Sequence, residues 1–204
     1  MLKQNKVFAF VWKNLYLRKV SYMKKIKIKL YAVTVLVVVI CYLLQCTVLP
    51  KIALASVKPN LMIIVTASYG FMRGKKEGMF IGFLSGLLID IQFGSIIGFY
   101  ALIYMLTGYV NGMFQQMYFN EDIKLPMLLI SASEFIYGLI IYFLMFLMRG
   151  EFEFVYYLSH IIIPELIYTI VVTLGVYPLI LFINNKLEAE EKRSADKFVE
   201  SIHK

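Results

Sequence analysis

Charged residues are scarce in this chain. Only 17% of its 204 residues are Asp, Glu, Lys or Arg, whereas 60% are hydrophobic, and the mean hydropathy is +0.73. A soluble domain carries charge on about a quarter of its residues, so this composition argues against a soluble globular protein. Long apolar runs separated by short polar segments indicate instead a polytopic membrane protein.

Cysteine and histidine are nearly absent. Cys41 and Cys46 both lie in the first apolar run, and the histidines His160 and His203 are far apart in the sequence. The two cysteines would point in different directions on a helix, and no His or acidic neighbour completes a metal set. The sequence also has no nucleophile–base–acid set, phosphate loop or HExxH motif. We therefore expect no enzyme activity, no metal and no cofactor.

Acidic residues are missing from residues 1–29, which contain nine Lys or Arg residues. The net charge of +8 does not indicate nucleic-acid binding, because the basic residues lie at the ends of apolar runs and form no aromatic-interleaved patch. We interpret 1–29 as a basic cytoplasmic head. Within it, residues 1–22 are either an extension from an upstream start codon, with Met23 the true start, or a basic helix on the membrane surface.

The apolar runs predict an all-α integral membrane protein with six transmembrane helices in a domain spanning 30–183. The expected spans are about 30–49, 57–72, 78–93, 95–117, 125–148 and 164–183. Pro164 would begin the last span, because proline suits the first helical position, and would leave 155–163 at the interface. A charged tail follows over 184–204. With both termini in the cytoplasm, 18 of the 21 basic residues lie inside, as the positive-inside rule requires.

Glycine recurs every fourth residue in the middle of the chain, with Asp90 taking one position of the series. Residues four apart share a helix face, and glycines on such a face allow close approach of a second helix backbone in a membrane. The row therefore predicts either packing among the chain's own helices or a groove for a partner helix. The interface candidates are Gly78, Gly82, Gly86, Asp90, Gly94, Gly98 and Gly108.

Polar residues inside the apolar runs are the other candidates, because charge at membrane depth is costly and often functional. Asp90 either caps the following helix or turn, or acts through its charge. Glu134 is either protonated and structural or the partner of a cation on another protein. Glu165, after Pro164, is expected to cap a helix start. The remaining intramembrane or interfacial candidates are Gln45, Asn60 and His160.

An ordered set of motifs resembles the MreD family of bacterial rod shape-determining membrane proteins. The set is Pro59-Asn60-Leu61, Arg73–Gly78, Gly82–Asp90, Gly94, Gly98, Ala101-Leu102 and Gly108-Tyr109. The resemblance is most specific over residues 45–112. The family is similar in turn to the six-helix substrate-binding subunits of energy-coupling-factor transporters, which also have cytoplasmic termini.

The resemblance implies a non-catalytic scaffold subunit of the cell-wall elongation complex in the bacterial cytoplasmic membrane. Its implied partners are MreC directly, then MreB, RodA and a class B penicillin-binding protein in the same complex, with membrane lipids around it and a homodimer as an open alternative. Two other functions remain open. One is the substrate-binding subunit of a vitamin or small-molecule transporter. The other is a proton-coupled transporter that uses Glu134 and Asp90.

Overall fold

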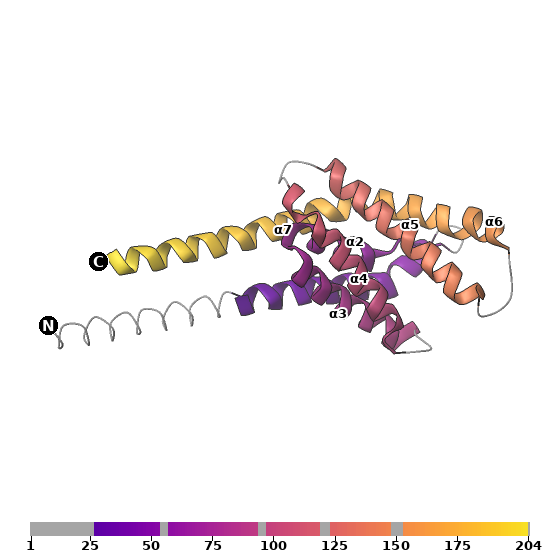
Figure 1. The fold of residues 1–204 in the computed structure, drawn as a ribbon, viewed down its shortest axis with the longest axis horizontal. Coiled ribbons are helices and arrows are strands. Elements are labelled where there is room, and N and C mark those ends of the chain that lie inside the picture. The colour runs from indigo at the N-terminus through magenta and orange to yellow at the C-terminus, as the bar shows by residue number, and fades with distance from the viewer. Residues whose placement is uncertain (1–26, 54–56, 94–96, 119–122, 148–152, 204) are drawn as a thin grey trace. The chain divides into compact units, whose positions relative to one another are not determined.

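The computed structural model describes residues 27–53, 57–93, 97–118, 123–147 and 153–203. The chain divides into two compact units: unit 1 comprises Met1–Leu36 and Phe182–Lys204, and unit 2 comprises Val37–Leu181. Every element assigned in the described residues is helical (Figure 1). The prediction of an all-helical chain is therefore confirmed for this part of the chain.

The helices follow one another with short connections. The first helix is Lys27–Thr47. After it come η1 (Leu49–Ile52), α2 (Leu61–Arg73), α3 (Lys75–Phe93), α4 (Phe99–Met113), η2 (Gln115–Met117), α5 (Lys124–Leu147), α6 (Phe154–Tyr157), η3 (Leu158–Ile162) and α7 (Ile163–His203). The first helix and α7 each continue from one unit into the other.

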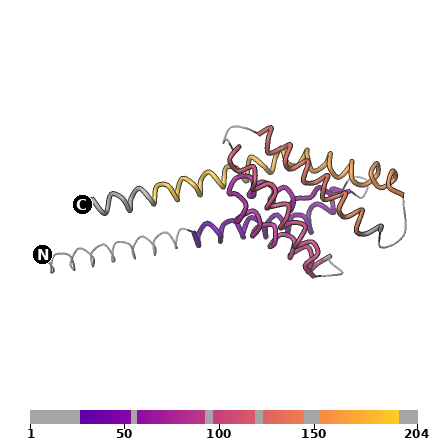
Figure 2. The backbone as a smooth tube through the Cα atoms, in the orientation of Figure 1, coloured from indigo at the N-terminus to yellow at the C-terminus, as the bar shows by residue number. Residues whose placement is uncertain are grey.

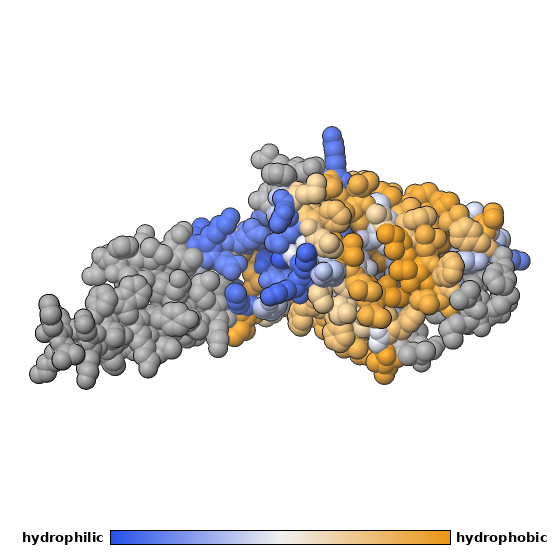
Figure 3. All heavy atoms as spheres, in the orientation of Figure 1, coloured by the Kyte–Doolittle hydropathy of each residue, from blue (hydrophilic) through white to orange (hydrophobic). Residues whose placement is uncertain are grey.

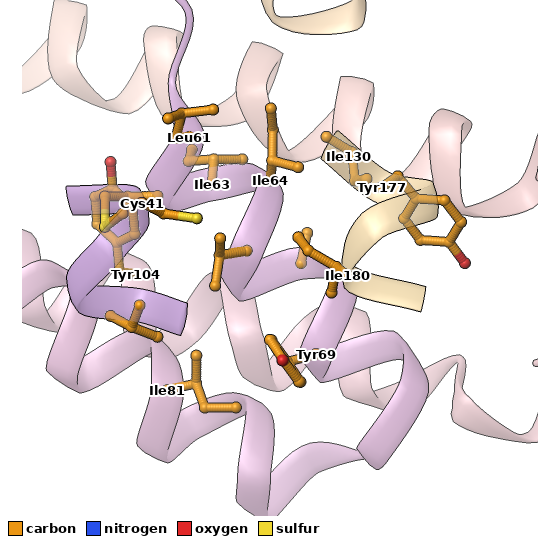
Figure 4. Close-up of a cluster of buried hydrophobic side chains, with 14 of the residues drawn as sticks. Cys41, Leu61, Ile63, Ile64, Tyr69, Ile81, Tyr104, Ile130, Tyr177 and Ile180 are labelled. Atoms are coloured by element: carbon orange, nitrogen blue, oxygen red, sulfur yellow. The ribbon is translucent and has the colours of Figure 1, made fainter. Parts of the chain in front are cut away.

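Helix α2 is the centre of unit 2. Its residues Leu61–Met72 are all buried, and none of them carries a charge, so the helix can be enclosed on every side. Figure 4 shows side chains of α2 among those of the surrounding helices, including Ile130 of α5 and Ile180 of α7. Only a helix without charged side chains can occupy this position without leaving a buried charge unpaired.

Helices α3 and α4 lie side by side (Figures 1 and 2), and glycines on both let their backbones approach closely. A Cβ added at Gly78 or Gly82 would come within 3.0 Å of a carbonyl oxygen of α4. The reciprocal contact comes from Gly108, which faces the backbone of Gly78. The glycine row is thus the surface on which these two helices meet.

Three helices are long and apolar enough to cross a membrane: Lys27–Thr47, Lys124–Leu144 and Phe154–Ser194. Large hydrophobic side chains are exposed on them and gather over unit 2 in Figure 3. Helices α2 and α4, with 13 and 15 residues, are roughly 20 Å long, shorter than the ~30 Å hydrocarbon core of a bilayer. The chain is a helical membrane protein with three helices of spanning length among the described residues.

The last helical segment differs from the sequence expectation. The helix begins at Phe154 rather than at Pro164, and the π-helical turn η3 lies immediately before Pro164. A proline inside a helix lacks an N–H group and clashes with the carbonyl four residues earlier. The wider turn at Leu158–Ile162 makes room for the ring, so the helix continues through the proline. It also continues through Pro178.

In unit 1 an ion pair joins the start of the first helix to the C-terminal half of α7. Lys29 Nζ lies 2.6 Å from Glu190 Oε2. Asn184 is fully buried and donates a hydrogen bond to Glu188 one turn later on α7. Residues 184–203 of the expected tail belong to α7 and are helical.

Candidate functional site

The N-terminus of α2 is capped by side chains from two elements. Asn60 Oδ1 accepts a hydrogen bond from the Ile63 backbone N–H at 3.2 Å, which is the ordinary N-cap arrangement. Gln45, from the first helix, accepts from the Met62 N–H at 3.1 Å. Two of the N–H groups that a helix start leaves unpaired are thereby satisfied.

Asn60 also connects α2 to α4 and α7. Its Oδ1 accepts a hydrogen bond from the Tyr104 hydroxyl at 3.0 Å, and its backbone N–H donates to Thr169 Oγ1 at 3.1 Å. Asn60 and Thr169 are buried, so these bonds form where water does not compete with them. The junction fixes the position of three helices around one point.

A cavity of about 230 Å³ lies beside this junction, within unit 2. Its lining combines amide, hydroxyl and charged side chains with a tyrosine cluster. The lining residues are Gln45, Lys58, Pro59, Asn60, Ile89, Tyr100, Tyr104, Tyr137 and Glu165. We call it the α2 N-terminal cavity. Its polar groups converge from the first helix, α4, α5 and α7 as well as from the start of α2.

Two acidic side chains are associated with the cavity. Glu165 of α7 is half-buried and lines it. Glu134 of α5 is 3% exposed, lies close enough to Glu165 for their charges to interact, and is one helical turn from the lining residue Tyr137. Glu134 Oε2 has no hydrogen-bond partner among the residues that the structure describes.

Asp90 lies at the end of α3 and caps the start of α4. One carboxylate oxygen accepts hydrogen bonds from the backbone N–H groups of Gly98 and Ala101, at 3.0 and 2.9 Å, and the other accepts from Tyr100 at 2.8 Å. Gly98 has φ +102°, a conformation that glycine adopts without strain. Because Tyr100 lines the cavity, Asp90 also helps to position one wall of it.

This arrangement is suited to holding a small ligand or a partner side chain. Amide and hydroxyl groups, one lysine and one glutamate line a small, partly open cavity together with aromatic rings, and convergent polar groups of this kind fix the orientation of a ligand. In the described part of the chain, no three His, Cys, Asp or Glu residues are grouped so that they could hold a metal ion.

A family model described as the rod shape-determining protein MreD matches residues 26–186. The chain belongs to the MreD family. The match extends over most of the chain, including every residue of the α2 N-terminal cavity. No curated protein and no solved structure matches the chain.

The structure brings together only some of the site candidates that the sequence suggested for this MreD-family chain. Gln45, Asn60 and Glu165 line one cavity, and Glu134 lies beside it. His160 is elsewhere: it is exposed in the π-helical turn, stacked on Tyr156 with 4.2 Å between ring centroids. Gly94 lies outside the described residues.

Two interpretations change. Glu165 was expected to cap a helix start, but the helix that contains it begins eleven residues earlier, at Phe154, so no free N–H groups lie beside it. The glycines of α3 were open to a partner helix, but α4 of the same chain occupies the face formed by Gly78, Gly82 and Gly86. This face is therefore not available to a partner helix.

Sequence reasoning missed the aromatic side of the cavity. Tyr100 and Tyr104 lie four residues apart on α4, so they share a face, and the rings of Tyr104 and Tyr137 make an edge contact with centroids 5.5 Å apart. The four-residue spacing of the two tyrosines in α4 could have been recognised in the sequence as a shared aromatic face. The approach of Tyr137 from α5 and the presence of Lys58 at the cavity depend on how the helices pack.

Proposed function

We propose that this protein is a non-catalytic scaffold subunit of the bacterial cell-wall elongation complex, located in the cytoplasmic membrane. In this role it binds MreC directly. Through that contact it supports peptidoglycan synthesis along the cell body, together with MreB, RodA and a class B penicillin-binding protein. The family match over residues 26–186 is the observation that carries the proposal.

The structure adds physical support for a binding role inside a membrane. Large apolar side chains are exposed along the helices of unit 2, for example Leu102 and Leu106 on α4 and Ile136 on α5. In a bilayer such residues contact lipid or the apolar face of another transmembrane helix. They provide surfaces for MreC that remain free after α3 and α4 have packed on each other.

We also propose that α2, α3 and α4 lie within the bilayer, which gives six membrane-embedded helices with both termini in the cytoplasm. Helix α2 is buried by its neighbours over nearly all of its length, so a short helix there need not match the bilayer thickness. The arrangement would resemble the substrate-binding subunits of energy-coupling-factor transporters.

The test is co-purification from native membranes. Tagged protein is extracted in mild detergent, and the recovered partners are identified by mass spectrometry. We expect MreC together with wall-synthesis enzymes. Recovery of paired ATPases and a large coupling subunit, without MreC, would contradict the proposal.

A second candidate function is the substrate-binding subunit of a small-molecule transporter. The α2 N-terminal cavity favours it, because such a subunit needs polar groups that converge on a cavity. The same purification distinguishes the two functions, since each predicts different partners.

A further inference from the structure

We propose that the α2 N-terminal cavity is a binding site for an organic ammonium group, held by Glu165 with Glu134 behind it and by the surrounding tyrosines. The site does not depend on the scaffold function proposed above. Its chemistry applies to a free small amine and to a lysine side chain of a partner polypeptide.

Acidic side chains outnumber basic ones at and beside the cavity, which favours a positively charged ligand. Glu165 lines the cavity and Glu134 interacts with it electrostatically, whereas Lys58 is the one basic residue of the lining. No salt bridge links either glutamate to a cation of the described residues. A buried carboxylate that ionises without a paired cation is unfavourable, so an incoming ammonium group would stabilise the ionised form.

The exposure of the three charged groups indicates where in the cavity a cation would bind. Lys58 is exposed, so its ammonium group is solvated outside or at the mouth. Glu165 is half-buried and Glu134 is 3% exposed, with Oε2 lacking a hydrogen-bond partner among the described residues. An ammonium group that enters past Lys58 would meet Glu165 first.

The aromatic lining is suited to the same ligand. Tyr100, Tyr104 and Tyr137 all contribute to the wall, and an ammonium group is attracted to the face of an aromatic ring. Asn60 Oδ1 offers little to the ligand, because it already accepts bonds from Ile63 and Tyr104. Gln45 Oε1 is neutral and already accepts one bond from Met62. Cation recognition therefore falls to the glutamates and tyrosines.

The size of the cavity limits what can enter. A volume of about 230 Å³ is below the ~300–1,000 Å³ that is usual for drug-sized ligands. It suits one compact amine, or the end of one side chain. Phenethylammonium is a suitable probe, and 2-phenylethanol is a control of the same shape without the charge.

The experiment measures binding of both compounds to the full chain in detergent by isothermal titration calorimetry. For the wild-type protein we expect phenethylammonium to bind about tenfold more tightly than 2-phenylethanol. Glu165→Gln should weaken amine binding about tenfold and leave alcohol binding unchanged. Glu153→Gln, an exposed acid at the start of α6, is the matched control and should bind the amine like the wild type.

Lys58→Ala should change the affinity for the amine in the direction opposite to Glu165→Gln. Removing the competing cation should tighten amine binding roughly threefold, and because Lys58 is exposed, the variant should fold even if Glu165→Gln does not. Equal affinity for amine and alcohol, or weaker amine binding in Lys58→Ala, would overturn the proposal. Absence of any amine binding would also overturn it, since a shared proton would then neutralise the glutamate pair.

The natural source of the ammonium group is found with protein purified from its own membranes. An amine released on denaturation from the wild type, but not from Glu165→Gln, identifies a free small molecule. Displacement of a co-purified polypeptide by phenethylammonium identifies a partner's lysine. If neither occurs, the cavity has no natural cation and the proposal is wrong.

Discussion

At the scale of single residues, Asp90 provides the side-chain cap at the start of α4, because the N-cap residue Gly98 has no side chain that could do so. Asp90→Ala leaves the N–H groups of Gly98, Tyr100 and Ala101 without their acceptor. We expect a loss of roughly 2 kcal/mol or more in the free energy of unfolding. Asp90→Asn should lose less of this free energy, because its one amide oxygen can still accept hydrogen bonds from the N–H groups. Thermal unfolding in detergent measures the stability of both variants. If Asp90→Ala were as stable as the wild type, water would cap the helix equally well.

Gly82 and Gly175 form a matched pair of helical glycines. A Cβ at Gly82 would come within 3.0 Å of the α4 backbone, whereas a Cβ at Gly175 meets nothing within 4 Å. Gly82→Ala should therefore force α3 and α4 apart and cost about 1–3 kcal/mol of stability. Gly175→Ala should be neutral or stabilising by up to about 1 kcal/mol, because Ala favours helix.

The same unfolding measurement compares the two glycine variants. Equal changes of stability in the two variants would mean that the close contact between α3 and α4 contributes nothing to the free energy of unfolding. The four-residue glycine spacing predicted a packing face from the sequence alone. Which of the two predicted occupants fills it, α4 or a partner helix, depends on the tertiary arrangement and could not be read from the spacing.

At the scale of helices, α2 and α5 differ in what surrounds their apolar side chains. Ile64 of α2 is completely buried by protein, whereas Leu128 of α5 is 66% exposed. Ile64→Ala should lower the unfolding free energy by about 2–5 kcal/mol through the cavity it leaves. Leu128→Ala should change it by no more than about 0.5 kcal/mol, because detergent or lipid replaces the lost contact.

A large effect at Leu128 would show instead that this face packs on another protein molecule in the purified sample. The concentration dependence of the unfolding midpoint tests that reading, since association makes the midpoint depend on protein concentration. The comparison therefore also addresses the homodimer that the sequence left open.

The helices themselves were largely predictable, but their ends were not. Long apolar runs, each with a single glutamate inside it, identify α5 and the last helix, because only a helix pairs all of its backbone groups in lipid. The start of the last helix at Phe154 was missed, because Pro164 was read as a helix start and the adjacent π-helical turn has no clear sequence signal. That misreading also concealed the position of Glu165 in the cavity wall.

For the whole molecule, the family could be predicted because ordered motifs survive in the sequence, and the family match confirms it. The α2 N-terminal cavity could not be predicted as a unit. Its residues range from Gln45 to Glu165, and no local pattern connects residues so far apart. Only the packing of the helices around the buried start of α2 brings them together.

Membrane topology is a property of the whole molecule, and two arrangements agree with the helix lengths. Six embedded helices place Lys51 outside the cell and Lys75, Lys124 and Lys192 inside. If only the three helices of spanning length crossed the bilayer, with the N-terminus inside, all four lysines would lie outside. Single cysteines at these exposed positions, with Cys41 and Cys46 replaced by Ala, therefore distinguish the two arrangements.

We expect an impermeant maleimide applied to spheroplasts to label Lys51→Cys alone, and to label the other three variants only after the membrane is opened. The basic residues support this outcome, because it keeps most of them in the cytoplasm. Labelling of Lys75→Cys in intact spheroplasts would mean that α2 does not cross the bilayer. The cavity would then lie in an extracytoplasmic domain, where its carboxylates would meet solutes directly from water.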